Sequence, residues 1–327
     1  MEIYAMRWHE AQKDRWSAVH VRKVEQALRR DVLPDLGRVP ISEIDGPMLL
    51  RTLRKVEARG AIDTAKRIRQ HMSAIFQFAM AEGVAAGDPA AGIVKGLRPS
   101  PPAGQQPAVR SIEEAREILR TMDASTSDPQ TKLASRLLAL TAVRPGIVRA
   151  ATWSEIEGVD WTDPGAPSPA AFWRIPAARM KLEQEDKTDK AFEHLVPLPE
   201  QAVAVLRQLR RLSGAHEFIF RSVRSSTKPM SENTIGYMYA RNGYSGRHVP
   251  HGWRATFSTV MNERAVAARR LEDRPIIDGM LAHKLKGISG SEMAYNRAIH
   301  WSRRCELAAE WADLLMKGLP HARSIMT

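Results

Sequence analysis

A proline-rich stretch near residue 100 most restricts how this chain can fold. Residues 98–107 read Arg-Pro-Ser-Pro-Pro-Ala-Gly-Gln-Gln-Pro. Proline has no backbone N–H and a fixed φ, so neither a long helix nor the interior of a sheet can continue through this stretch. Because 327 residues is also long for one hydrophobic core, we expect two domains, 1–97 and 109–327, joined by a linker over 98–108.

The first domain is predicted to be helical. Ser17 can cap a helix that runs to about Arg30, and Gly46-Pro47 begins a second helix that ends near Gly60. A third helix is expected over 61–82, because its apolar residues recur at helical spacing: Ile68, Met72, Ile75, Phe76 and Met80.

The second domain combines helices with a few short strands. Ser111-Ile112-Glu113-Glu114 is a capping box for a helix to about Met122. Further helices are expected near 129–140, 200–212, 231–240, 251–264, 274–282 and 300–317, and strands near 151–157, 171–175 and 194–198. The polar residues 179–193 would form a long, mobile hairpin. The predicted fold class is mainly α with a small antiparallel β-sheet (α+β).

The last predicted helix, 300–317, has an apolar stripe that leaves two interpretations open. Leu307, Trp311, Leu314 and Leu315 lie on one face of it. The stripe either packs on the core of its own domain or docks onto a neighbouring subunit.

The charge of the chain indicates a polyanionic partner. Formal net charge is +12 and the sequence pI is about 10.1, although a basic protein without a nucleic-acid role stays an alternative. The two predicted helices over 47–60 and 61–82 carry a set of cations that we expect to contact DNA phosphates rather than merely face solvent: Arg51, Arg54, Lys55, Arg59, Lys66, Arg67 and Arg69.

Several classes of protein are not expected. Cys305 is the only cysteine, so no disulfide within the chain and no cysteine-based metal site is expected. No apolar run approaches the ~18 residues of a membrane span, and the start of the chain lacks the features of a signal peptide. These observations favour a cytoplasmic protein associated with the bacterial nucleoid, and not with a membrane.

A tyrosine and two arginines suit the cutting and rejoining of a DNA strand without a cofactor. Such a reaction needs a nucleophile that stores the bond energy covalently, and positive charge on the non-bridging phosphate oxygens. Tyr295 is the candidate nucleophile, although a buried tyrosine with a satisfied hydroxyl is the commoner case for this residue type. Arg144 and Arg254 are the candidate phosphate clamps, although either could simply form a surface ion pair.

Two histidines and a lysine are candidates for proton transfer. His251 and Arg254 stand three residues apart, which places them on one face of a helix. His283 and Lys181 could also reach a reacting phosphate, but a solvated lysine and a structural histidine are common alternatives. No metal site is predicted, since the chain has no His-Glu-x-x-His string and neither histidine has an acidic residue at ligand spacing.

The order and wording of these motifs resemble the tyrosine recombinase (phage integrase) family. The string 138–149 resembles the first arginine motif, 172–181 with 194–198 the β-hairpin with its lysine, 250–259 the His-x-x-Arg helix, and 281–297 the His…Tyr ending. The turns at 33–37 and 88–90 resemble those of the helical, SAM-like core-binding domain. The resemblance is to integrases of prophages and integrative elements, and it covers nearly the whole chain.

The resemblance implies a mechanism and an assembly. Tyr295 would form a 3′-phosphotyrosine and free a 5′ hydroxyl, while Arg144 and Arg254, helped by His283, stabilise the transition state. Lys181 would protonate the leaving oxygen and His251 would assist as acid or base. No metal or other cofactor would take part. Four protomers would exchange strands between two double-stranded DNA attachment sites, with the C-terminal helix 300–317 contacting a neighbouring protomer.

Two features depart from the family pattern. The acidic residue expected three positions after Arg144 is replaced by Ile147, which removes a polar partner from that region. The additional N-terminal arm-binding domain common in these integrases is also not expected here. The sequence therefore leaves open a type IB-like topoisomerase, with the same chemistry but no partner exchange, and a catalytically inactive DNA-binding protein of the same fold.

Overall fold

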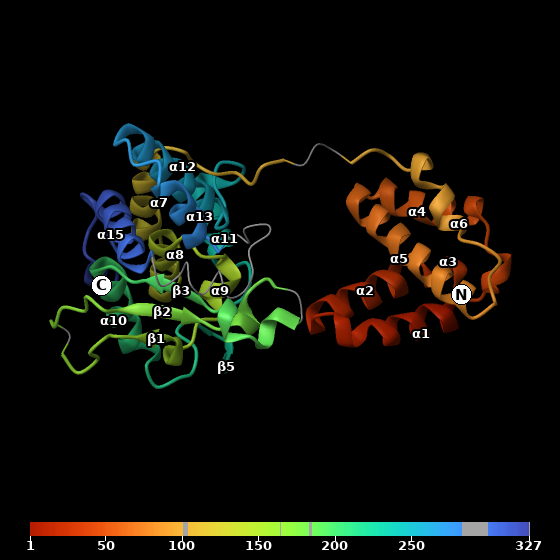
Figure 1. Cartoon of the computed structure of the whole chain (residues 1–327), viewed down its shortest axis with the longest axis horizontal. Coiled ribbons are helices and arrows are strands. Elements are labelled where there is room, and N and C mark those ends of the chain that lie inside the picture. Colours follow the sequence, from red (N-terminus) through yellow and green to blue (C-terminus); the bar gives the residue numbers. More distant parts are fainter. Residues whose placement is uncertain (101–103, 164, 183–184, 283–299, 327) are drawn as a thin grey trace. The chain divides into compact units, whose positions relative to one another are not determined.

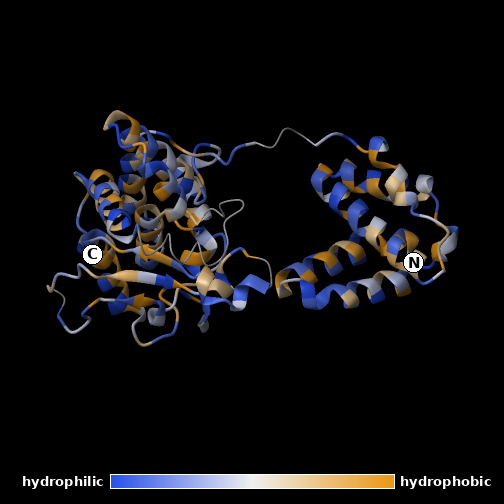
Figure 2. Cartoon of the chain, in the orientation of Figure 1, coloured by the Kyte–Doolittle hydropathy of each residue, from blue (hydrophilic) through white to orange (hydrophobic). Residues whose placement is uncertain are grey.

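The computed structural model describes residues 1–100, 104–163, 165–182, 185–282 and 300–326. The chain divides into two compact units, Met1–Gly104 and Gln105–Thr327. The division falls inside the proline-rich stretch. Each unit has its own hydrophobic cluster of buried side chains, and Figure 2 shows polar and apolar residues interspersed along the helices of both units.

The first unit consists of helices and short turns (Figure 1). Its helices are α1 (Glu2–Gln12), α2 (Ala18–Asp31), α3 (Leu33–Leu36), α4 (Gly46–Ala58), α5 (Ile62–Ala81) and α6 (Pro89–Gly92). The Ser17 hydroxyl accepts from the His20 N–H at the start of α2, as predicted, and the Asp45 carboxylate accepts from the Met48 N–H at the start of α4. The core lies between α2, α4 and α5, where Leu28, Leu53 and Met72 are fully buried.

The second unit is built around one buried helix. Helix α8 (Pro129–Thr141) is buried along nearly its whole length and packs against four longer or neighbouring helices of the unit. These are α7 (Ile112–Ala124), α10 (Glu200–Ser213), α11 (Thr234–Tyr239) and α15 (Trp301–Met316). The unit also contains α9 (Pro145–Arg149), α12 (Gly252–Ala267) and α13 (Asp273–Met280).

Two small antiparallel sheets accompany these helices, which confirms the predicted α+β class. Strands β1 (Ile156–Glu157), β2 (Phe172–Ile175) and β3 (His194–Pro197) form a sheet in the order β1-β2-β3. Trp173 pairs with Ile156 on one side and with Val196 on the other. Strands β4 (Arg221–Ser222) and β5 (Ser225–Pro229) form a separate hairpin that was not predicted.

The structure corrects two details of the prediction. The strand expected over 151–157 pairs with β2 only at its last two residues, because Thr152 and Glu155 form a capping box that turns Trp153–Glu155 into a 3-10 helix. The hairpin expected over 179–193 does connect the antiparallel strands β2 and β3, but this connection contains 3-10 turns at Ala177–Arg179, Glu185–Thr188 and Lys190–Phe192.

The apolar stripe of α15 packs on its own unit. Leu307, Trp311 and Leu315 are fully buried, and the Trp311 indole N–H donates to the Ala139 carbonyl of α8 at 2.9 Å. Among the described residues, no helix is long and apolar enough to cross a membrane.

Candidate active site

The end of α8 positions Arg144. Ala142 follows the helix in the left-handed conformation, with φ of 49°, and its N–H donates to Leu138. Arg144 then caps α9, with Pro145 in the first helical position. Its Nη2 lies 3.4 Å from the Ala282 carbonyl oxygen, to which it donates.

Arg254 lies in the first turn of α12 and is buried, with 6% of its surface exposed. Its Nη1 donates to the Ala142 carbonyl at 3.2 Å and its Nη2 to the Leu281 carbonyl at 2.7 Å. The guanidinium therefore joins the turn before Arg144 to the end of α13. Both arginines line one small cavity with Val143, Ile147, Ile175, Met180, His194, Leu281 and Ala282.

The two arginines hold positive charge that no described residue neutralises. In the part of the chain that the structure describes, neither has a carboxylate partner. Burial, and then the nearby Arg144 charge, lower the pKa of Arg254 to about 10, and burial lowers the pKa of Arg144. Both remain cationic at neutral pH, which suits them to bind an anion such as a phosphodiester.

The other predicted catalytic residues differ in how the structure places them. His251 is the exposed N-cap residue of α12, whereas Arg254 is buried one turn later. Lys181 is exposed directly after Met180, which lines the cavity. His283 and Tyr295 lie outside the described residues.

The cations predicted to contact DNA from the first unit fall into two groups. Four have partners within the protein: Lys55 bonds to Asp35 at 2.7 Å, Arg59 to Asp31 at 2.6 Å, Lys66 to the Ser100 hydroxyl at 2.9 Å, and Arg69 to the Ala90 carbonyl at 3.2 Å. The exposed Arg51, Arg54 and Arg67 have no such partner among the described residues. The prediction treated all seven alike, and these contacts distinguish them.

The sequence analysis missed a second group of polar residues behind the cavity. Arg179 bonds to the Glu155 carboxylate and donates from Nη2 to the Ile147 carbonyl at 2.6 Å. Glu155 is buried and also accepts from the Trp173 indole at 2.9 Å. Ile147 therefore lines the cavity with its apolar side chain and holds Arg179 with its backbone. The string Thr-Trp-Ser-Glu, a capping box, was the available signal for Glu155.

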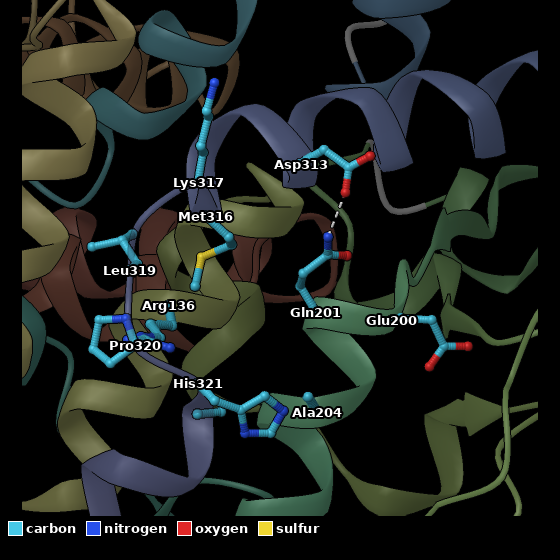
Figure 3. Close-up of a pocket in the computed structure, with 11 residues that line it drawn as sticks. Arg136, Glu200, Gln201, Ala204, Asp313, Met316, Lys317, Leu319, Pro320 and His321 are labelled. Atoms are coloured by element: carbon cyan, nitrogen blue, oxygen red, sulfur yellow. Dashed lines mark hydrogen bonds between the residues drawn. The ribbon is translucent and has the colours of Figure 1, made fainter.

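A larger cavity, of about 520 Å³, lies between α8, α10 and the segment after α15 (Figure 3). Gln201 donates to Asp313 there at 2.6 Å. Arg136 also lines it, but this buried guanidinium pairs with Asp123 at 2.5 Å. None of the predicted catalytic residues that the structure describes lines this cavity, so we do not assign the reaction to it.

Family models match both units of the chain. The model of the phage integrase central domain matches residues 1–95, and that of the phage integrase family matches 111–284. Prophage integrase IntZ of Escherichia coli K12 is 32% identical over 94% of this chain and 69% of its own length. The integrase of Enterobacteria phage P4 is 29% identical over 96% of this chain and 69% of its own length.

Solved structures show the same fold. A lambda integrase dimer bound to a COC′ core site covers 88% of this chain and 97% of its own, with a TM-score of 0.63 and 16% identity. The Tn1549 transposon integrase in complex with transposon right end DNA covers 90% of this chain and 98% of its own, with a TM-score of 0.59 and 13% identity. With both of its units matched by integrase models, the chain belongs to the phage integrase family and is a site-specific tyrosine recombinase.

Proposed function

We propose that this recombinase cuts and rejoins duplex DNA at a phosphodiester bound by Arg144 and Arg254. The observation that carries the proposal is the pair formed by the half-buried Arg144 and the buried Arg254, which line one cavity from α9 and α12 and, among the described residues, bind only backbone carbonyls. A phosphate bound beside the two guanidiniums would supply a negative charge that none of the described residues provides to them.

The reaction proceeds by attack of the Tyr295 oxygen on phosphorus. A bond forms between this oxygen and phosphorus while the bond to the 5′ oxygen breaks, and a 3′-phosphotyrosine and a 5′ hydroxyl result. Lys181 gives its proton to the leaving 5′ oxygen. His251 exchanges the proton of the nucleophile, and His283 assists the arginines. The reverse reaction with another 5′ hydroxyl joins the strands, so the energy of the broken bond is conserved without a metal or nucleotide cofactor.

The two units divide the work on the DNA. We assign DNA binding to the helical unit Met1–Gly104 and catalysis to Gln105–Thr327. Arg51, Arg54 and Arg67 are the best candidates for phosphate contacts in the first unit, because they are exposed cations without a partner among the described residues. Lys55, Arg59, Lys66 and Arg69 would have to exchange a contact within the protein for one with DNA.

Recombination requires several copies of the chain. We propose four protomers on two attachment sites, supported by the shared fold with a lambda integrase tetramer bound to a Holliday junction, which has a TM-score of 0.62. The predicted contact of 300–317 with a neighbouring protomer cannot use the stripe of Leu307, Trp311 and Leu315, which is buried in its own unit. The exposed face of α15 and the residues after Met316 are what remains for that contact.

Covalent trapping tests the proposed reaction. Wild-type protein is mixed in EDTA with nicked suicide duplexes that carry attachment sites from the native locus, beside Tyr295→Phe and Tyr237→Phe, a matched control at an exposed tyrosine. We expect a denaturation-resistant adduct for wild type and Tyr237→Phe, and none for Tyr295→Phe. If wild type binds these duplexes without forming an adduct, the proposed reaction is wrong.

A further inference from the structure

Three consecutive backbone carbonyls at the end of α13 are each bound by a different side chain of the candidate active site. The Met280 carbonyl lies 3.1 Å from Nε2 of His194. The Leu281 and Ala282 carbonyls accept from Arg254 and Arg144, as described above. The three side chains come from β3, α12 and the start of α9, so this short backbone segment joins three separate elements.

The end of a helix is well suited to this role. The last carbonyls of a helix have no partner within it, and they form the negative end of the helix dipole. Helix α13 ends at Met280, and Ala282 then adopts the left-handed conformation with φ of 50°. The carbonyl oxygens of Leu281 and Ala282 therefore offer partial negative charge to the two guanidiniums. Unlike a carboxylate, they would not compete with phosphate for the full charge of the arginines.

His194 donates a hydrogen bond to this segment as a neutral imidazole. It is buried, with 7% of its surface exposed, and it lines the cavity with both arginines. A carbonyl oxygen only accepts, so Nε2 of His194 carries the hydrogen. Burial, followed by the charges of Arg304, Arg254 and Arg144, lowers the pKa of His194 to about 3 against the opposing effect of the Met280 carbonyl. The imidazole is therefore uncharged at neutral pH.

The strand that carries His194 is itself held from another side. Arg304 of α15 donates from Nη2 to the carbonyl of Leu195, the next residue of β3. The position of His194 is thus fixed by α15 as well as by the pairing of β3 with β2, in which His194 lies opposite Ile175. Because these two sets of contacts hold the strand, the His194 side chain can set the position of the backbone that it binds.

We propose that His194 is a positioning residue of the recombination site, which holds the end of α13 so that Leu281 and Ala282 present their carbonyls to Arg254 and Arg144. The proposal rests on the proposed function, because its consequence is the correct placement of the two phosphate-binding arginines. In the sequence, position 283 follows this segment directly. His194 thereby also fixes the point from which the chain continues toward His283.

Two substitutions separate positioning from simple filling of space. His194→Leu keeps a buried side chain of similar size but removes the donor, whereas His194→Gln keeps an N–H near the position of Nε2. A buried carbonyl left unsatisfied costs about 1–3 kcal/mol, equivalent to about 5- to 150-fold in rate if the cost falls on the transition state. We expect His194→Leu to lower the single-turnover cleavage rate of a suicide duplex by this factor, with DNA affinity unchanged within about twofold.

Rescue by the conservative variant is the decisive readout. His194→Gln should regain most of the cleavage rate, while His194→Asn, whose amide ends short of the Met280 carbonyl, should behave like His194→Leu. The comparison of the Gln and Asn variants keeps the test valid if His194→Leu does not fold. His216→Leu, a histidine of the same unit with no role in the site, serves as the matched control and should cleave like wild type.

The outcomes are distinguishable from failure of the proposed function. If wild type forms the adduct and His194→Leu or His194→Asn forms it at the wild-type rate, the positioning role is wrong while the proposed function stands. Equal loss in the Gln and Asn variants would also overturn it, since a donor restored near the position of Nε2 would then have no effect on the rate. If wild type forms no adduct, the proposed function itself is wrong.

Discussion

Two arginines of the first unit, Arg30 and Arg59, and the two arginines of the candidate active site are held in opposite ways. In the first unit, Asp31 is buried and binds both Arg30 and Arg59 at its two oxygens. Burial alone would raise the pKa of Asp31, but the two guanidiniums hold it below its ordinary value. In the second unit, Arg144 and Arg254 are desolvated yet bind only backbone carbonyls among the described residues.

The difference separates charges that stabilise the fold from those that we propose to serve the reaction. A buried cation that has a carboxylate partner is already neutralised and has little attraction left for phosphate. A buried cation on carbonyl dipoles keeps its charge, at a cost in desolvation that a bound anion offsets. The second unit contains both types, since the buried Arg136 pairs with Asp123. Four predictions, from the largest expected effect to the smallest, test this distinction.

Removing the carboxylate partner of a structural arginine should damage folding. Asp123→Asn leaves the Arg136 charge buried without compensation, and we expect the free energy of unfolding to fall by about 3–5 kcal/mol. Urea unfolding measures the change, with Asp313→Asn, at an exposed residue, as the control. Stability equal to wild type would mean that Arg136 does not depend on its partner.

Removing a carbonyl-bound arginine should damage the reaction instead. In Arg254→Met the relief of a desolvated charge offsets the two lost hydrogen bonds, so we expect the unfolding free energy to change by less than about 2 kcal/mol. The rate of adduct formation should fall by at least about 10²–10³-fold. Arg254→Lys, which keeps the charge but not the planar fork, should also lose most of the rate. If Arg254→Met lost as much stability as Asp123→Asn, the carbonyl-bound arginine would serve the fold as much as the carboxylate-paired one does.

Acid should destabilise both units through buried histidines. Burial, with nearby positive charges, lowers the pKa of His71 to about 4, and burial lowers that of His248 to about 4 and that of His194 to about 3. The unfolded chain, with histidine pKa values near 6.5, therefore binds these protons first. The stability is fully present above pH ~6.5 and is lost as the pH falls toward 4, by up to ~1.4 kcal/mol per pH unit for each histidine.

Replacing one of these histidines assigns its share of the pH dependence. His71→Gln should flatten the pH dependence of stability of the first unit between about pH 6.5 and 4, while His216→Gln should not. Thermal unfolding across this range measures both. A slope that His71→Gln leaves unchanged would show that His71 titrates normally in the folded protein.

Exposed arginines of the first unit should act through salt-dependent DNA affinity alone. Arg54→Ala and Arg67→Ala should each reduce the slope of log affinity against log salt by about 1, with no change in stability. Arg59→Ala, which removes a partner of Asp31, is the matched comparison and should lower stability with little change in slope. Equal slopes for all three variants would mean that the carboxylate partners do not determine which arginines reach DNA.

The sequence predicted the helices whose apolar residues recur along one face, but it did not predict α1 (Glu2–Gln12). It did not predict the β4–β5 hairpin, since the polar residues of Ser225–Pro229 have no apolar alternation. It placed His251 and Arg254 on one helix face, but the structure buries only Arg254, because His251 stands at the solvent-exposed start of α12. His194 was visible only as a residue at the start of a strand, and its role depends on a carbonyl 86 positions away.

The two left-handed alanines give the candidate site a mechanical property. The carbonyl of Ala142 holds Arg254, and the carbonyl of Ala282 holds Arg144, which itself follows Ala142 in the chain. Together with the bond from Arg254 to Leu281, these contacts form a closed loop of backbone and guanidinium groups. Neither arginine can shift without pulling on the other. We therefore expect a phosphate that draws one guanidinium toward it to displace the second as well. The two arginines would then respond to DNA together rather than as two independent charges.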